Sequence, residues 1–148
     1  MPYGIGEIED LVLTALDVAP LNVYCKAFDR YDGQFDVEDI KNLRVNPPVV
    51  FVAYAGDSLV ENSPMARYTK VMNVSVIAVS QNLRGNFESK TDATGGAYKM
   101  VDDIQGILHL NSLGKSDIVG MVLKRRVPLL NTMTLAAFGM DFTLEFIA

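Results

Sequence analysis

The chain has 148 residues and a mass of 16.3 kDa, a size that predicts one domain, residues 1–148, with its own hydrophobic core. Hydrophobic residues make up 49% of the chain and charged residues 21%, as in folded globular proteins. One Cys, one His and no Trp exclude a disulfide framework and a zinc site built from Cys and His. The composition therefore predicts neither a metal site nor a bound cofactor.

The net charge of −5 is unevenly distributed along the chain. Residues 7–39 hold nine acids and two bases, whereas the remainder holds nine acids and eleven bases. Because duplex DNA is bound through clustered Lys and Arg, specific DNA binding is not expected. The N-terminus lacks the basic and apolar regions of a signal peptide, and no run reaches the roughly 18 apolar residues of a membrane helix. These features predict a cytosolic protein without a membrane partner.

The first predicted element is an amphipathic helix over Ile5–Leu16, with acids opposite an apolar stripe. Leu13 lies off that stripe, so it is either partly exposed or covered by another subunit. A strand is predicted from the alternation over Asn22–Phe28, then a turn over Asp29–Gln34. Asp36 is typical of an N-cap of a short helix.

The apolar run Val49–Ala55 predicts a strand buried on both faces, and Gly56–Pro64 a polar loop. A long strand is predicted over Tyr68–Ser80. The polar stretch Asn82–Thr94 then has the length of a mobile arm or a lid.

Thr94 is predicted to cap a helix that ends near Leu108. Two strands follow, Ile118–Val127 and Thr132–Ile147, and the second shows the cleanest alternation in the chain. The expected fold is α+β, with a largely antiparallel sheet of about five strands and two main helices packed on it.

Neither His109 nor Cys25 supports nucleophilic catalysis. His109 is predicted at the C-terminal end of a helix, where the dipole stabilises it, and Cys25 lies inside a predicted strand as a small buried hydrophobe. Asp102 and Asp103 are adjacent on a helix, so their side chains diverge by about 100° and cannot act as a catalytic pair. We therefore expect no catalytic residues and no enzymatic activity.

Residues 32–39 resemble the second half of an EF-hand calcium loop, with Gly33 as the turn glycine. In that register the first and third ligand positions fall on Phe28 and Arg30, which supply no carboxylate. The segment is better interpreted as an acidic turn that leads into a helix.

The only basic cluster is Lys124-Arg125-Arg126. On a strand, Lys124 and Arg126 share a face and Arg125 points away, so at most two charges converge. That is too few for nucleic-acid affinity. The cluster is instead a candidate partner for the acidic N-terminal third across a subunit boundary.

Several segments of the chain resemble the tail terminator-like proteins of Mu-like phages and prophages, the Mu Gp37-like family. The similarity spans nearly the whole chain and is carried by the segments Ile5-Gly6-Glu7-Ile8-Glu9-Asp10, Val49–Gly56, Ser80–Gly85, Gly95-Gly96-Ala97-Tyr98 and Ala137–Phe142.

The resemblance implies a non-enzymatic virion protein: a subunit of a hexameric ring at the neck-proximal end of a contractile tail. Such a ring caps the tail tube, stops tail polymerisation and joins the neck or head, after assembly in the host cytoplasm. The implied partners are further copies of the chain, the tube, the sheath and the neck or head-completion protein, and DNA passes through without specific binding. Leu13, Lys124, Arg125 and Arg126 are then candidate subunit-interface residues.

One alternative from another class remains. The chain is compatible with a small anion- or peptide-binding α+β domain in which residues 82–94 form a loop lid over the helix N-terminus at Gly95-Gly96.

Overall fold

The computed structural model describes residues 3–25, 27–30, 48–62, 67–81, 97–131 and 135–147. Their strands form one five-stranded sheet in the order β1-β2-β3-β5-β4. The β1–β2 pair is parallel and the other three pairs are antiparallel. The elements are α1 (Ile5–Leu16), α2 (Leu21–Tyr24), β1 (Ala27–Arg30), β2 (Val49–Asn62), β3 (Arg67–Gln81), α4 (Ala97–Leu108), β4 (Ile118–Asn131) and β5 (Leu135–Ile147).

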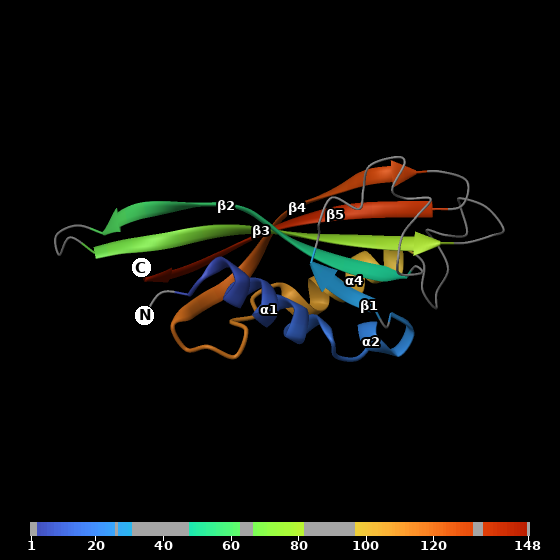
Figure 1. Ribbon diagram of the computed structural model, residues 1–148, viewed down its shortest axis with the longest axis horizontal. Coiled ribbons are helices and arrows are strands. Elements are labelled where there is room, and N and C mark those ends of the chain that lie inside the picture. Colours follow the sequence, from blue (N-terminus) through green and yellow to red (C-terminus); the bar gives the residue numbers. More distant parts are fainter. Residues whose placement is uncertain are drawn as a thin grey trace.

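The helices lie against one face of a strongly twisted sheet (Figure 1). The apolar stripe of α1 is buried there through Ile8, Val12 and Leu16, as its helical spacing predicts. The alternation in β5 is equally informative, because its inward residues are buried in the same cluster: Met140, Phe142, Leu144 and Phe146. The α+β expectation with a mostly antiparallel sheet is confirmed.

The first half of β2 is buried on both faces, as its continuous apolar run predicts. Val50 and Val52 belong to the core under the helices, while Val49 and Phe51 alternate with them and are also 0–1% exposed. Burial decreases after that, since Ala53 and Tyr54 are half-buried and Ala55 is exposed. The predicted burial on both faces is therefore right for Val49–Val52 and overestimated for residues 53–55.

The predicted strand over Asn22–Phe28 is wrong in its first half. The backbone N–H of Cys25 donates to the carbonyl of Leu21 at 2.9 Å, which closes the single helical turn of α2. Leu21 is fully buried, whereas Val23 is 69% exposed, so the alternation there does not report a strand. The strand β1 begins at Ala27 and includes Asp29 and Arg30, which the sequence assigns to a turn.

The predicted loop over Gly56–Pro64 is also wrong, because β2 continues to Asn62. The register with β3 shifts between Tyr54 and Asp57, and Gly56 within that shift has φ +104°, a conformation that glycine adopts without strain. The strand resumes after this bulge with polar residues because it has left the core.

At the C-terminal side, β4 runs on past the predicted end at Val127 and includes Pro128, which an edge strand tolerates. The short helix predicted after Asp36, the polar stretch 82–94 with Thr94, and residues 132–134 lie outside the described residues.

Candidate functional site

The basic cluster lies on β4, the strand at one edge of the sheet. Arg125 donates through Nε to Asp141 Oδ2 on the neighbouring strand at 2.6 Å. Arg126 donates through Nη1 to Asp102 Oδ1 on α4 at 3.1 Å. Since Asp102 lies on the helix side, the two guanidinium groups lie on opposite faces of the sheet, as the alternation predicts. Lys124 is exposed and lies at the register shift between Leu123 and Arg125.

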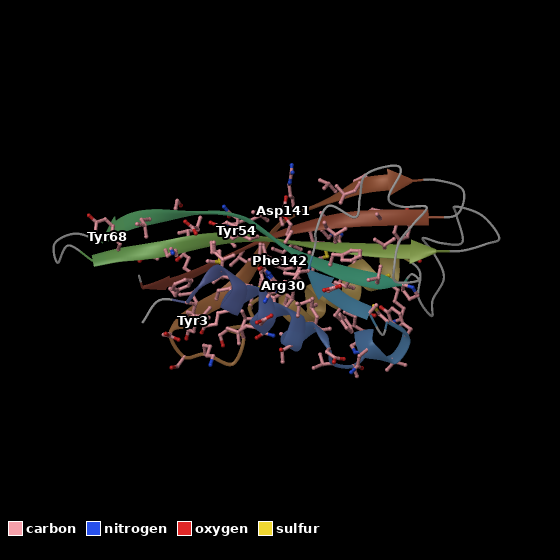
Figure 2. The ribbon with its side chains drawn as sticks, viewed as in Figure 1. Tyr3, Arg30, Tyr54, Tyr68, Asp141 and Phe142 are labelled. Atoms are coloured by element: carbon pink, nitrogen blue, oxygen red, sulfur yellow. The ribbon has the colours of Figure 1, made fainter. Side chains whose placement is uncertain are left out.

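Asp141 is the centre of a small polar network on the face that the helices leave open (Figure 2). It accepts a second hydrogen bond from the hydroxyl of Ser75 at 2.9 Å. The hydrogen bond from Arg125 is the main cause that lowers the pKa of Asp141 below its ordinary value. Arg125 is therefore already engaged within its own chain.

Leu13 is half-buried and packs against the edge of the core. With Thr14, Asp17 and Phe28 it lines a shallow depression of about 410 Å³ beside the C-terminal end of α1. The depression combines an apolar surface, from Leu13 and Phe28, with the exposed carboxylate of Asp17. Leu13 is thus neither fully exposed nor part of the core.

The acids of α1 are partly neutralised by Arg30 of β1. Its guanidinium pairs with Asp10, lies 3.9 Å from Glu9, and donates to the carbonyl oxygen of Gly6 at 3.1 Å. This contact attaches β1 to α1. Glu7 and Asp17 remain exposed at the two ends of the helix.

Three tyrosines donate to aspartates, a pattern that the sequence did not predict. Tyr24 of α2 donates to Asp103 of α4 at 2.5 Å, and burial with this hydrogen bond raises its pKa. The same Asp103 forms an ion pair with Lys99 at 3.1 Å. Tyr3 donates to Asp117 at 2.5 Å, which raises the pKa of Tyr3 to about 12, and Tyr54 donates to Asp57 at 2.6 Å. The pairs of Tyr24 and Tyr3 link segments that are distant in the sequence, whereas the pair of Tyr54 lies within β2.

The side chains that resemble catalytic groups have structural contacts. His109 Nδ1 accepts a hydrogen bond from the backbone N–H of Leu123 at 3.2 Å, just after α4 ends. The Cys25 thiol is buried and donates toward the carbonyl oxygens of Ala27 and Pro48. Asp102 and Asp103 have separate partners, as their divergence on the helix predicts.

Within the described ranges no group of three or more His, Cys, Asp or Glu side chains is arranged to hold a metal ion. The EF-hand-like segment 32–39 lies outside those ranges, as do Leu83-Arg84-Gly85, Gly95-Gly96 and the predicted lid. Among the helices that the structure describes, none has the length and apolar character to cross a membrane.

The described surface of this α+β domain carries ion pairs within the chain and shallow depressions. The chain matches the family described as bacteriophage Mu, Gp37, over residues 4–147, and it belongs to that family. No curated protein sequence shows a significant match to it.

Among solved structures, a chain of the virion of a native gene transfer agent (GTA) particle shares the fold, with a TM-score of 0.63 at 13% sequence identity. The alignment covers 99% of this chain and 100% of that one. Family membership thus places the chain among bacteriophage proteins, and the structural match shows that the fold occurs in a virion particle.

Proposed function

We propose that the chain is a phage tail terminator, a single-domain, non-enzymatic subunit of a hexameric ring that caps the head-proximal end of the tail tube. The match to the bacteriophage Mu Gp37 family over residues 4–147 carries this proposal. The fold shared with a GTA virion chain supports it. The ring stops tail polymerisation and provides the surface to which the neck or head is joined.

A closed ring requires a heterologous interface, in which one surface meets a different surface of the next subunit. The chain offers two unlike surfaces, because residues 7–39 are acidic and the remainder is slightly basic. Leu13 and Lys124–Arg126 are the proposed interface residues. In the contractile tail of a Mu-like phage, the ring also contacts the tube and the sheath.

In this proposal the ring assembles in the host cytoplasm and stays in the virion at the neck-proximal end of the tail. DNA passes through it without specific binding, since an acidic lumen repels the phosphate backbone. The net charge of the chain, −5, is compatible with such a lumen.

The direct test is deletion of the gene from its phage, with tail length measured by electron microscopy. Loss of a terminator leaves tails of irregular length, and an intact copy supplied in trans restores a uniform length. Tails of normal length in the deletion would rule out the terminator role. Light scattering of the purified chain tests the ring separately, because a hexamer has six times the 16.3 kDa mass of the subunit.

A further inference from the structure

Residues 59–62 of β2 and 67–70 of β3 form the end of the sheet that extends beyond α1, and we call this segment the arm (Figure 1). The strand β1 pairs only with Val49–Val52 of β2, so it does not reach the arm. The strand β5 accompanies β3 only as far as the pair Thr69–Ile147. The outer part of the arm is therefore a two-stranded hairpin.

One cross-strand row shows where the core ends. It joins Ile118, Phe146, Lys70 and Leu59 across β4, β5, β3 and β2. Ile118 and Phe146 are 4% and 2% exposed, and the ring of Tyr3 packs edge-on against Phe146 at 5.3 Å. Leu59, in the same row, is 57% exposed. The face of the sheet that is buried at Ile118 and Phe146 is thus exposed at Leu59.

Tyr68 lies further out on that face and is 44% exposed near the free end of the arm (Figure 2). It stands between Arg67 and Lys70, and residues 62–80 contain these two bases and no acid. On the β2 side, Glu61 is the cross-strand partner of Tyr68, so residues 59–62 and 67–70 together hold one acid and two bases. Lys70 lies two positions from Tyr68 on the same face of β3. An exposed Tyr is typical of an interface anchor, because Tyr is enriched among residues that dominate binding energy.

The α1 depression has the complementary character. Leu13 and Phe28 supply an apolar surface, Asp17 lines it, and residues 5–17 contain four acids and no base. The depression has a volume of about 410 Å³ and is open to the solvent. The depression lies toward α2, whereas the arm extends in the opposite direction, so an arm does not reach the depression of its own chain (Figure 1).

We infer that the arm of one copy docks on the α1 depression of a second copy, with Tyr68 against Leu13 and Phe28 and Lys70 facing Asp17. The inference rests on the proposed ring and names the surfaces through which its subunits meet. Arm and depression are different surfaces at different ends of the molecule, so the contact is heterologous, the kind from which closed rings are built, and not the contact of a two-fold dimer.

Charge reversal tests the contact. Lys70→Glu is expected to shift the purified chain from the ring toward the 16.3 kDa monomer in native mass spectrometry, and Tyr68→Ala is expected to do the same. Asp17→Lys combined with Lys70→Glu restores opposite charges and should recover the ring. Val119→Ala is the matched control, because Val119 is 60% exposed on β4 and lies outside both surfaces. Rings that survive both arm variants would overturn the inference and assign the arm to another tail protein.

A cross-link in assembled particles tests the same contact where the ring is formed. Leu13→Cys and Tyr68→Cys are introduced together into the phage gene, and the tails are oxidised and separated on a non-reducing gel. Cys25 is fully buried and stays in place. A ladder of linked subunits supports the contact, and either single variant should give none.

The two proposals fail in different ways. If the wild-type chain is present in the tails and controls their length, but the paired cysteines give no ladder, the docking inference is wrong and the terminator role stands. If the chain is absent from the tails, or its deletion leaves tail length unchanged, the terminator role is wrong and the docking inference falls with it.

Discussion

Gly120 determines how closely the chain returns from α4 to β4. Leu110 has φ +65° in the connecting turn, and its N–H donates to the carbonyl of Met121 at 2.5 Å. The N–H of Met121 donates in return to the carbonyl of Asn111 at 2.9 Å. A Cβ on Gly120 would lie 2.6 Å from the Leu110 carbonyl oxygen, which is backbone and cannot rotate away. Only glycine fits between the turn and the strand.

We expect Gly120→Ala to lower the free energy of unfolding by about 1–3 kcal/mol, the usual cost of overpacking. Gly106→Ala is the control. Gly106 lies inside α4, and a Cβ there meets nothing within 4 Å. Because alanine favours the helix over glycine, this variant should gain about 1 kcal/mol. Urea unfolding followed by circular dichroism measures both. A neutral Gly120→Ala would contradict the close approach.

Asp141 links stability to pH. Its pKa in the folded chain is lowered, first by the hydrogen bond from Arg125, below the ordinary value of 3.8. A group with a lowered folded pKa contributes stability that is present above the ordinary pKa and is lost as the pH falls through the folded pKa. The Arg125 side chain is 68% exposed, so screening by water keeps the contribution small.

We therefore expect Arg125→Gln to lower the free energy of unfolding at pH 7 by at most about 1 kcal/mol. This difference from wild type should shrink steadily as the pH falls below 3.8, because Asp141 is then protonated in both proteins. Urea unfolding of both proteins at several pH values measures this difference as a function of pH. Lys124→Gln removes the same charge one position away and should show no such narrowing. A constant difference across the pH range would mean that Arg125 acts through packing.

At the scale of the elements, the sheet has two parts that differ in burial. Its helix-covered part contains the core, whereas the arm has neighbouring strands but no helix above it. Leu144 and Leu59 mark the contrast, with exposures of 1% and 57%. The arm therefore adds little to the stability of the isolated chain, as expected of a segment that acts by contact with another molecule.

Alanine substitution at these two leucines measures the contrast. Leu144→Ala should cost about 2–5 kcal/mol, because it leaves a cavity in the core. Leu59→Ala should stay within about 0.5 kcal/mol of wild type, because the side chain is already largely in water. Chemical unfolding of both variants measures their free energies of unfolding. A large loss for Leu59→Ala would show that the arm is part of the folding core.

The elements that the sequence predicts well are those whose burial pattern is regular. The stripe of α1 and the alternation of β5 place Ile8 and Phe142 in the core, and both are fully buried. The prediction fails where burial is not the organising force. Residues 57–62 are polar enough to resemble a loop, yet pairing with β3 makes them a strand. At Asn22–Tyr24, one buried leucine and one backbone hydrogen bond favour a helical turn over the alternation.

The interaction surfaces were predictable only in part, because they depend on distant pairs. Leu13 stands out by its position off the helix stripe. Nothing local indicates that Arg125 pairs with Asp141 and Arg126 with Asp102, since these partners are brought together by the sheet register and by α4. The arm was missed because its β2 half was assigned to a loop, although its β3 half was predicted as a strand from Tyr68 onward.

At the scale of the whole molecule, several charged side chains are paired within the chain. Arg30 pairs with the acids of α1, while the two arginines of β4 pair with Asp141 and Asp102 and not with the N-terminal third. Lys124, Glu7 and Asp17 remain exposed. Among the described residues, the charge that distinguishes residues 7–30 from the rest of the chain is thus carried by fewer groups than the composition indicates.

Substitution of Arg126 distinguishes a role within the chain from a role in the contact between subunits. We expect Arg126→Glu to lower the mass of the ring in native mass spectrometry, because it reverses a charge of the proposed interface. Arg126 is also paired with Asp102 within the chain. Asp102→Asn is therefore the control, because it breaks the same ion pair and leaves the cation in place. This control should keep the full ring, since Asp102 is 74% exposed and the pair contributes little to folding.

An unchanged ring in Arg126→Glu would remove Arg126 from the interface. Equal loss in both variants would show that Arg126 acts by holding β4 to α4, and not by contact with the next subunit.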